Sequence, residues 1–179
     1  GGGGRGGRRR PWGLFGRGAK ATGPAGLTVV VTLRIISEYD QSPPAGTWSD
    51  RQKIAGGPLY DLGRVVRSSG SPSGVFLVTG KAIADAQKAH STSGEVHDSD
   101  TRFVAALIAE LGNGSGEYID SEWCSTGTKA IAACDAYRLR RRQNCTYPDG
   151  RVVSIDVEYF LKFCINKNGY VVSTISVHT

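Results

Sequence analysis

Four cysteines carry the most evident chemistry in this chain, and all of them lie in its last third. They are Cys124, Cys134, Cys145 and Cys164, separated by 9, 10 and 18 residues, and the first 123 residues contain none. An even number of cysteines packed this closely is typical of secreted modules held by disulfides and unusual for a cytosolic enzyme. The pattern therefore predicts two disulfides, each worth about 2–4 kcal/mol of stability.

Sequence alone permits three pairings of the four cysteines. We expect Cys134–Cys164, which would join two helices, and Cys124–Cys145, which would join a strand to a loop. Free buried thiols are an alternative, because cysteine packs as a small hydrophobic residue. Zinc is disfavoured because no closely spaced Cys or His pair is present, and His90 and His97 match no metal-ligand spacing. No metal or cofactor is expected.

Three short motifs also point to the secretory pathway. Asn113-Gly114-Ser115 and Asn144-Cys145-Thr146 fit the N-glycosylation acceptor pattern, so we expect glycans on Asn113 and Asn144. Arg140-Arg141-Arg142 is the kind of basic run that processing proteases cut. A cut after Arg142 would leave residues 143–179 attached through the two bridges, whereas an uncut, solvated basic loop is the alternative. The expected location is extracellular.

The net charge of +6 belongs to the N-terminal segment alone. Residues 1–26 are Gly/Arg-rich with almost no hydrophobic periodicity, which predicts a disordered leader. Six of the 22 basic residues lie in the first 20, where there is no acid, so the other 16 balance the 16 acidic residues. The leader favours attraction to anionic membranes or cell walls, and the neutral body argues against specific nucleic-acid recognition. The leader's arginines are Arg5, Arg8, Arg9, Arg10 and Arg17.

No stretch approaches the roughly 18 apolar residues of a membrane-spanning helix, so no transmembrane segment is expected. The chain starts at Gly1 and contains no methionine. We interpret it as a mature form from which a signal peptide has been removed.

Residues 27–179 are expected to form one domain that positions these groups. β-branched and alternating residues predict strands, while alanine-rich stretches and apolar residues at helical spacing predict helices. The predicted strands span 27–39, 75–79, 117–123 and 170–178, and the predicted helices span 59–67, 79–86, 101–111, 126–136 and 155–165.

A helix, loop, helix, glycine, strand pattern occurs twice in this list, over about 79–123 and 126–178. Both units begin with Thr-Gly and run into an alanine-rich segment, which favours an internal duplication over chance similarity. Two such units and the first strand predict an α+β fold, a two-layer sandwich with helices on one face of an antiparallel sheet.

The cysteine-bearing half resembles the killer toxins secreted by smut fungi and yeasts. Those proteins combine a Ser-Thr or Thr-Gly turn leading into a helix with a central cysteine, a loop cysteine and a Phe-X-X-Cys helix. The matching residues, within about 122–170, are Cys124-Ser125-Thr126-Gly127, Ala132-Ala133-Cys134, Asn144-Cys145 and Phe160–Cys164. The toxins are richer in cysteine and lack the Gly/Arg leader. The resemblance implies an α/β sandwich, basic-site processing and non-enzymatic action on target-cell membranes or channels; secreted fungal effectors share this shape.

The sequence thus predicts a secreted, disulfide-stabilised toxin or effector that binds a target-cell surface or membrane component. Two alternatives stay open. The leader resembles the Arg-Gly-Gly segments of intracellular RNA-associated proteins. Arg34, Ser91-Thr92-Ser93 and Asp120-Ser121-Glu122 also follow the order of motifs in ADP-ribosylating toxins of the enterotoxin class, although the acidic motif departs from Glu-X-Glu.

Overall fold

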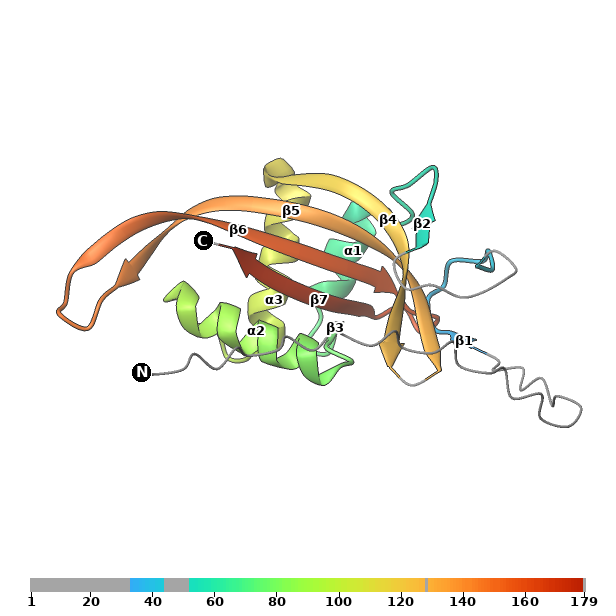
Figure 1. Cartoon of the computed structure of the whole chain (residues 1–179), viewed down its shortest axis with the longest axis horizontal. Coiled ribbons are helices and arrows are strands. Elements are labelled where there is room, and N and C mark those ends of the chain that lie inside the picture. The colour runs from blue at the N-terminus through green and yellow to red at the C-terminus, as the bar shows by residue number, and fades with distance from the viewer. Residues whose placement is uncertain (1–32, 44–51, 128, 179) are drawn as a thin grey trace, which may run out of the picture. The chain divides into compact units, whose positions relative to one another are not determined.

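The computed structural model describes residues 33–43, 52–127 and 129–178, all within one compact unit of the chain (Figure 1). The predicted leader and the first six residues of the predicted first strand, 27–32, lie outside the described residues. So do Arg5, Arg8, Arg9, Arg10 and Arg17, on which the expected attraction to anionic surfaces rests. In the rest of the predicted first strand, only Arg34–Ile35 forms a strand.

A seven-stranded sheet frames this unit, in the order β2-β4-β5-β6-β7-β3, with β1 paired to β5. The long neighbours β4 to β7 are antiparallel, whereas β1 and β3 run parallel to their partners. The strands are β1 (Arg34–Ile35), β2 (Gln52–Ile54), β3 (Val75–Phe76), β4 (Gly116–Gly127), β5 (Ala130–Thr146), β6 (Val152–Ile165) and β7 (Val171–His178).

Three helices precede the long strands, and each begins at a capping side chain. They are α1 (Leu62–Ser69), α2 (Gly80–Ser93) and α3 (Asp100–Glu110), and a π-type turn, η1 (Leu111–Ser115), follows α3. The side chains of Asp61, Thr79 and Ser99 accept the hydrogen bonds that cap α1, α2 and α3. The helices predicted at 59–67, 79–86 and 101–111 are confirmed, as is the expected mixture of helices with a mainly antiparallel sheet.

The core lies between α3 and the central strands. Phe103 and Leu107 of α3 are fully buried with Tyr159 and Phe163 of β6, and the rings of Phe103 and Tyr159 meet edge to face at 6.0 Å. Every second residue of β6 from Val157 to Ile165 is buried, as expected for a strand with one face on the core. Burial of these aromatic and branched side chains, worth roughly 2 kcal/mol each, holds the helices against the sheet.

Two predicted helices are strands. Residues 126–136 belong mostly to β4 and β5, and residues 155–165 form all of β6 except its first three residues. The alternation of Ile155, Val157, Tyr159, Leu161 and Phe163 has the strand period of two, which outweighs the helical spacing that we had favoured. The predicted duplication loses its basis, because the described part of 126–178 contains no helix.

The loop predicted between the helices at 126–136 and 155–165 is largely wrong as well. β5 continues to Thr146 and turns back into β6 through Tyr147–Arg151, where Gly150 adopts a left-handed φ of 81°. β4 pairs with β5 only as far as Leu139, and β7 pairs with β6 only as far as Glu158. Residues 140–157 therefore form a two-stranded ribbon, here called the hairpin arm, which extends from the sheet in Figure 1.

Asp135 anchors the segment before α1 to the centre of the sheet. Its buried carboxylate accepts hydrogen bonds from the backbone N–H groups of Leu59 and Tyr60, at 2.9 and 3.0 Å, and from the hydroxyl of Ser121 at 2.6 Å. Burial raises the pKa of Asp135 despite these donors. Gly57 approaches Ser121 so closely that a Cβ would lie 2.1 Å from its hydroxyl oxygen, so only glycine fits there.

Candidate functional site

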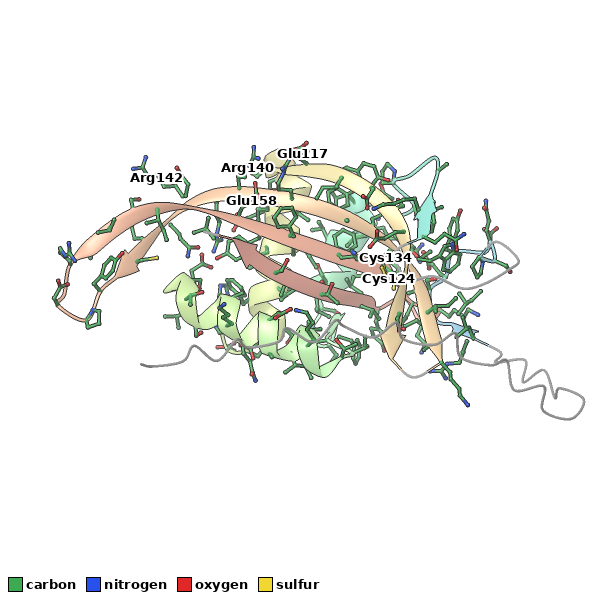
Figure 2. All side chains as sticks on the ribbon, in the orientation of Figure 1. Glu117, Cys124, Cys134, Arg140, Arg142 and Glu158 are labelled. Carbon is green, nitrogen blue, oxygen red and sulfur yellow. The ribbon has the colours of Figure 1, made fainter. Side chains whose placement is uncertain are left out.

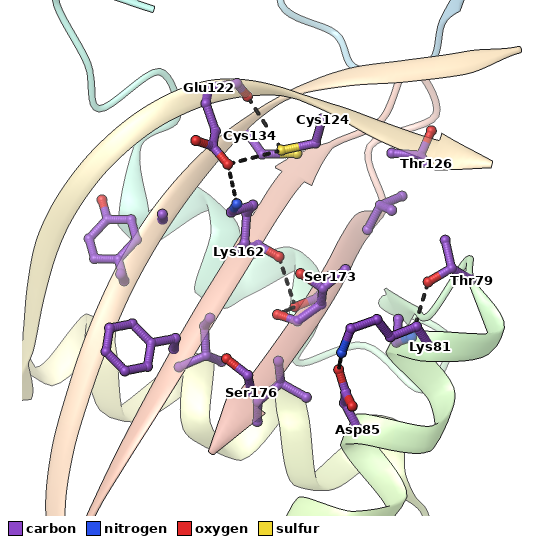
Figure 3. A pocket seen from close by; sticks show the side chains of 18 of the residues that line it. Thr79, Lys81, Asp85, Glu122, Cys124, Thr126, Cys134, Lys162, Ser173 and Ser176 are labelled. Carbon is purple, nitrogen blue, oxygen red and sulfur yellow. Dashed lines mark hydrogen bonds and ion pairs between the residues drawn. The ribbon is translucent and has the colours of Figure 1, made fainter. Parts of the chain in front are cut away.

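A cavity of about 770 Å³, here called the Glu122 pocket, opens at the Cys124 end of the sheet (Figure 3). Strands β4 to β7 supply most of its lining, and the first turns of α2, including Lys81 and Asp85, border it. Its volume lies within the about 300–1,000 Å³ typical of small-molecule sites.

Glu122 is the most buried charged group in this pocket. Its side chain is only 3% exposed, because β4 is paired with β2 on one side and β5 on the other. The carboxylate accepts hydrogen bonds from the ammonium groups of Lys162 and Lys53, the latter at 2.8 Å. The Cys124 sulfur lies 3.8 Å from Oε1. A buried carboxylate therefore has two cationic partners and a thiol donor, and Figure 3 shows Lys162 and Cys124 beside it.

These ion pairs fix the charge state of the cluster. Burial alone would raise the pKa of Glu122, but hydrogen bonds from Lys162 and Lys53 outweigh it and leave the pKa below its usual 4.5. Burial would likewise lower the pKa of Lys162, and the hydrogen bond to Glu122 reverses this. The hydrogen bonds to Asp120 and Glu122 raise the pKa of Lys53. All three groups are ionised at neutral pH, which makes them poor proton donors or acceptors for catalysis near pH 7.

Three cysteines lie close to this cluster, and two of them line the pocket. Cys124 and Cys134 border the cavity, whereas Cys164 is fully buried. A hydrogen bond to Cys134, followed by burial, raises the pKa of Cys124. Cys124 tends to lower the pKa of Cys134, but Cys164 and complete burial raise it well above its usual value. The two pocket thiols are therefore protonated and not poised as nucleophiles.

All four cysteines are free thiols in this structure, and the Cys134–Cys164 disulfide stays a prediction. The pairing Cys124–Cys145 is wrong for a geometric reason. Cys145 lies eleven residues along β5 from Cys134, roughly 36 Å at about 3.3 Å per residue, and a disulfide needs Cα atoms within about 7 Å. The structure does bring Cys134 and Cys164 together, as the sequence analysis expected. They lie on two neighbouring strands, however, and not on two helices.

The tribasic segment lies in the hairpin arm, in β5. Arg140, Arg141 and Arg142 are paired with Glu158, Val157 and Asp156 of β6. Figure 2 shows Arg140 beside Glu158, with which it forms an ion pair at 2.6 Å, and Arg142 further along the strand. A protease must bind its substrate as an unpaired extended chain, so cleavage after Arg142 would require the arm to open.

Arg141 fastens the arm to the helices. Its side chain is 14% exposed and forms ion pairs with Glu95, before α3, and with Glu110 at the end of α3. Its guanidinium also lies 5.1 Å from the centre of the Tyr159 ring. A cation that bridges two acids and an aromatic ring in a mostly buried site is a structural fastener, unlike its exposed neighbours Arg140 and Arg142.

The remaining sequence candidates are dispersed. Asn113 and Asn144 are both exposed, in η1 and on the arm, so a glycan would fit at either position.

Ser91-Thr92-Ser93 ends α2, where its hydroxyls donate to helix carbonyls. This segment is therefore not the strand motif of the ADP-ribosylating toxins. His90 pairs with Asp100 at 2.8 Å and His97 with Glu95 at 2.9 Å, and no group of metal ligands occurs among the described residues.

Comparisons with family models, curated proteins and solved structures found no match for this chain. Among the described residues, no helix is long and apolar enough to cross a membrane.

The sequence analysis missed Glu122 and Lys162 as a pair. A signal was present, because Lys162 is the lone charge within the apolar run Tyr159–Ile165. A lysine in a buried strand needs a partner. Its partner comes from β4, some 40 residues earlier, and only the fold reveals it.

Replacement of Glu122 by Gln tests the buried ion cluster. The folded pKa of Glu122 lies below the unfolded value, so its contribution is complete at neutral pH and is lost as the pH falls from about 4.5 through the folded pKa. We expect Glu122→Gln to lower the free energy of unfolding by about 3 kcal/mol at pH 7 and by progressively less in more acidic buffer. Urea unfolding of the wild type and the variant, at pH 7 and in the acidic buffer, measures this difference in free energy.

Glu117→Gln is the matched control, because Glu117 is exposed on the same strand and pairs with Arg138. It should cost less than about 1 kcal/mol. A Glu122→Gln effect that is equal at neutral and acidic pH would contradict the assigned charge state.

Neighbouring arginines test the fastening of the arm. Arg141→Met removes the cation that the carboxylates of Glu95 and Glu110 share and should destabilise the protein by about 3 kcal/mol. His97 remains as a partner of Glu95. Arg140→Met, one residue away and 67% exposed, should cost less than about 1 kcal/mol. Thermal unfolding gives both values, and equal losses for the two variants would refute the fastening role of Arg141.

Proposed function

We propose that this protein acts by binding, not by catalysis, and that the Glu122 pocket takes a small uncharged amphiphile. The balance of charge within the pocket carries this proposal. Its lining contains three cationic and three anionic side chains, and each is paired with another lining residue. The charged groups are Lys53, Lys81, Lys162, Asp85, Asp120 and Glu122.

An ionic ligand would have to break one of these pairs or enter without a counter-charge, and both cost free energy. An uncharged ligand avoids that cost. Apolar side chains of the lining, such as Val78, Ile119 and Val172, would contact its hydrocarbon part. The buried hydroxyl of Thr126 has no hydrogen-bond partner among the described residues and suits a polar head group.

n-Octyl β-D-glucoside, below its critical micelle concentration, is a suitable probe because it joins an alkyl chain to an uncharged polyol. We expect saturable changes in the amide NMR signals of Thr126, Val172 and Thr174. Octyl sulfate and octylammonium should bind at least about tenfold more weakly, a difference of about 1.4 kcal/mol. Tighter binding of either charged chain would refute the charge argument.

Two tryptophan variants locate the binding. Thr174 is exposed and lines the pocket, so Thr174→Trp should fill it and abolish the saturable shifts without disturbing the core. Ser154→Trp is the matched control, since Ser154 is an exposed strand residue in the hairpin arm, away from the pocket. Unchanged binding by Thr174→Trp would place the probe elsewhere.

The wider biological role stays as the sequence predicts it: a secreted toxin-like or effector protein that binds a target-cell surface component. The exposure of Asn113 and Asn144 supports passage through a glycosylating pathway. Burial of α3 against β6 supports the two-layer sandwich that the resemblance implies. The Arg-Gly-Gly-like leader favours the intracellular alternative, a protein with an RNA-binding arm and reduced cysteines.

Growth assays separate these two roles. Protein produced through a eukaryotic secretory pathway should carry glycans on Asn113 and Asn144 and should inhibit the growth of susceptible fungal or plant cells. Asn113→Gln with Asn144→Gln serves as the unglycosylated control. A panel of targets that all grow normally, together with four free thiols in the natural protein by non-reducing mass spectrometry, would favour the intracellular role.

A further inference from the structure

Three thiols converge from three neighbouring strands, with Cys134 of β5 in the middle. β4 carries Cys124, which is paired opposite Ala132 and therefore lies diagonal to Cys134. β6 carries Cys164, which faces Cys134 just beyond the last registered pair, Asp135 and Phe163. The Cys134 thiol interacts with both Cys124 and Cys164.

The three thiols differ in their access to solvent. Cys124 is partly exposed, and with Cys134 it lines the Glu122 pocket, where Figure 3 shows the two side by side. Cys164 is completely buried and does not border the pocket. A reagent that enters the pocket therefore meets Cys124 first, with Cys134 beside it.

We propose that this cluster is a redox-sensitive modification site in which Cys134 is the shared member of two alternative disulfides, Cys124–Cys134 and Cys134–Cys164. A disulfide oxidant such as glutathione disulfide, entering through the pocket, forms the Cys124–Cys134 bond first. The inference rests on the position of the thiols and holds whether or not the pocket binds an amphiphile.

The chemistry is two successive thiol–disulfide exchanges. The Cys124 thiol loses its proton and attacks glutathione disulfide, which forms a Cys124–glutathione bond and releases one glutathione. The Cys134 thiol then loses its proton and attacks the Cys124 sulfur, which forms the Cys124–Cys134 bond and releases the second glutathione. Two protein thiols are oxidised, and one glutathione disulfide is reduced to two glutathione molecules.

A third exchange reaches the buried cysteine. The Cys164 thiolate attacks the Cys134 sulfur, forming Cys134–Cys164 and releasing Cys124 as a thiol. The first disulfide joins β4 to β5 and removes the thiol that Cys124 offers to Glu122. The second joins β5 to β6 and restores that thiol. Oxidation state would thereby alter the donors around the pocket carboxylate.

Peptide mapping of the full chain tests the proposal. The reduced protein is incubated with glutathione disulfide, quenched with an alkylating reagent and digested with trypsin without reduction. Lys129 separates Cys124 from Cys134, and Lys162 separates both from Cys164, so each disulfide joins two distinct peptides. We expect the Cys124–Cys134 pair early and Cys134–Cys164 as the second product, with Cys145 outside both.

Single substitutions identify the shared member. Cys134→Ser should form neither disulfide and should stop at glutathione on Cys124. Cys164→Ser should retain Cys124–Cys134, and Cys145→Ser should behave as wild type. Cys134→Ala is a second substitution at the same position, and circular dichroism of both variants checks that they are folded. A Cys124–Cys164 disulfide in either Cys134 variant, a Cys145 disulfide within one wild-type molecule, or no disulfide in the wild type would overturn the proposal.

The pH dependence supplies a second readout. Only thiolates exchange, and burial and mutual hydrogen bonds keep Cys124 and Cys134 protonated. The rate of disulfide formation should therefore rise about tenfold per pH unit from pH 7 to 9 without a plateau. A plateau below pH 9 would show that an ordinary exposed thiol reacts instead.

Discussion

The strict alternation of side chains along β5 is the constraint on which the rest of the structure depends. Asp135, Tyr137, Leu139 and Arg141 lie on the face that meets the helices, while the residues between them belong to the opposite face. A shift of one residue would exchange the two sets and bury Arg138 and Arg140 in the core. Asp135 pins the register, because its carboxylate is held by two backbone N–H groups and the hydroxyl of Ser121.

Near each end of β5 a buried or mostly buried charge is neutralised across strands or helices. Toward the beginning, Glu122 is matched by Lys162 and Lys53. Toward the end, Arg141 is matched by Glu95 and Glu110. Buried ion pairs add little net stability compared with apolar packing, but removal of one partner is costly. Each cluster therefore specifies which elements meet, and it leaves little uncompensated charge for a ligand.

The first half of the fold could be predicted from the sequence, because its signals are local. Thr79 and Ser99 cap helices whose apolar residues recur at helical spacing, and Gly94 ends α2 in a left-handed conformation. In the second half, the strands predicted at 117–123 and 170–178 are confirmed by β4 and β7, but β5 and β6 could not be predicted in the same way. Ala130–Ala136 has helix-forming residues, yet it becomes a strand because β4 and β1 pair with it, and small side chains suit its buried position.

The same distinction separates the parts of the candidate site. Cysteine content indicated that thiols would meet, and the sequence analysis expected Cys134 and Cys164 to be neighbours because each belongs to a predicted helix that packs against the other. Cys124 belongs to the thiol cluster because β4 pairs with β5, and Cys145 does not belong to it because it lies far along the hairpin arm. Pairing across strands is non-local, and no residue spacing within one segment encodes it.

Lys162 links the chemistry of the pocket to that of the thiols. Its ammonium group neutralises Glu122, and its charge also favours the thiolate forms of Cys124 and Cys134. Burial and thiol–thiol hydrogen bonds oppose the effect of Lys162 on the two thiols and outweigh it. The cation therefore neutralises the carboxylate but leaves both thiols protonated. If Glu122 were neutral, Lys162 would lose its main partner and its charge would act more strongly on the sulfurs. The charge of one buried carboxylate thus governs both the polarity of the pocket and the reactivity of the cysteines that line it.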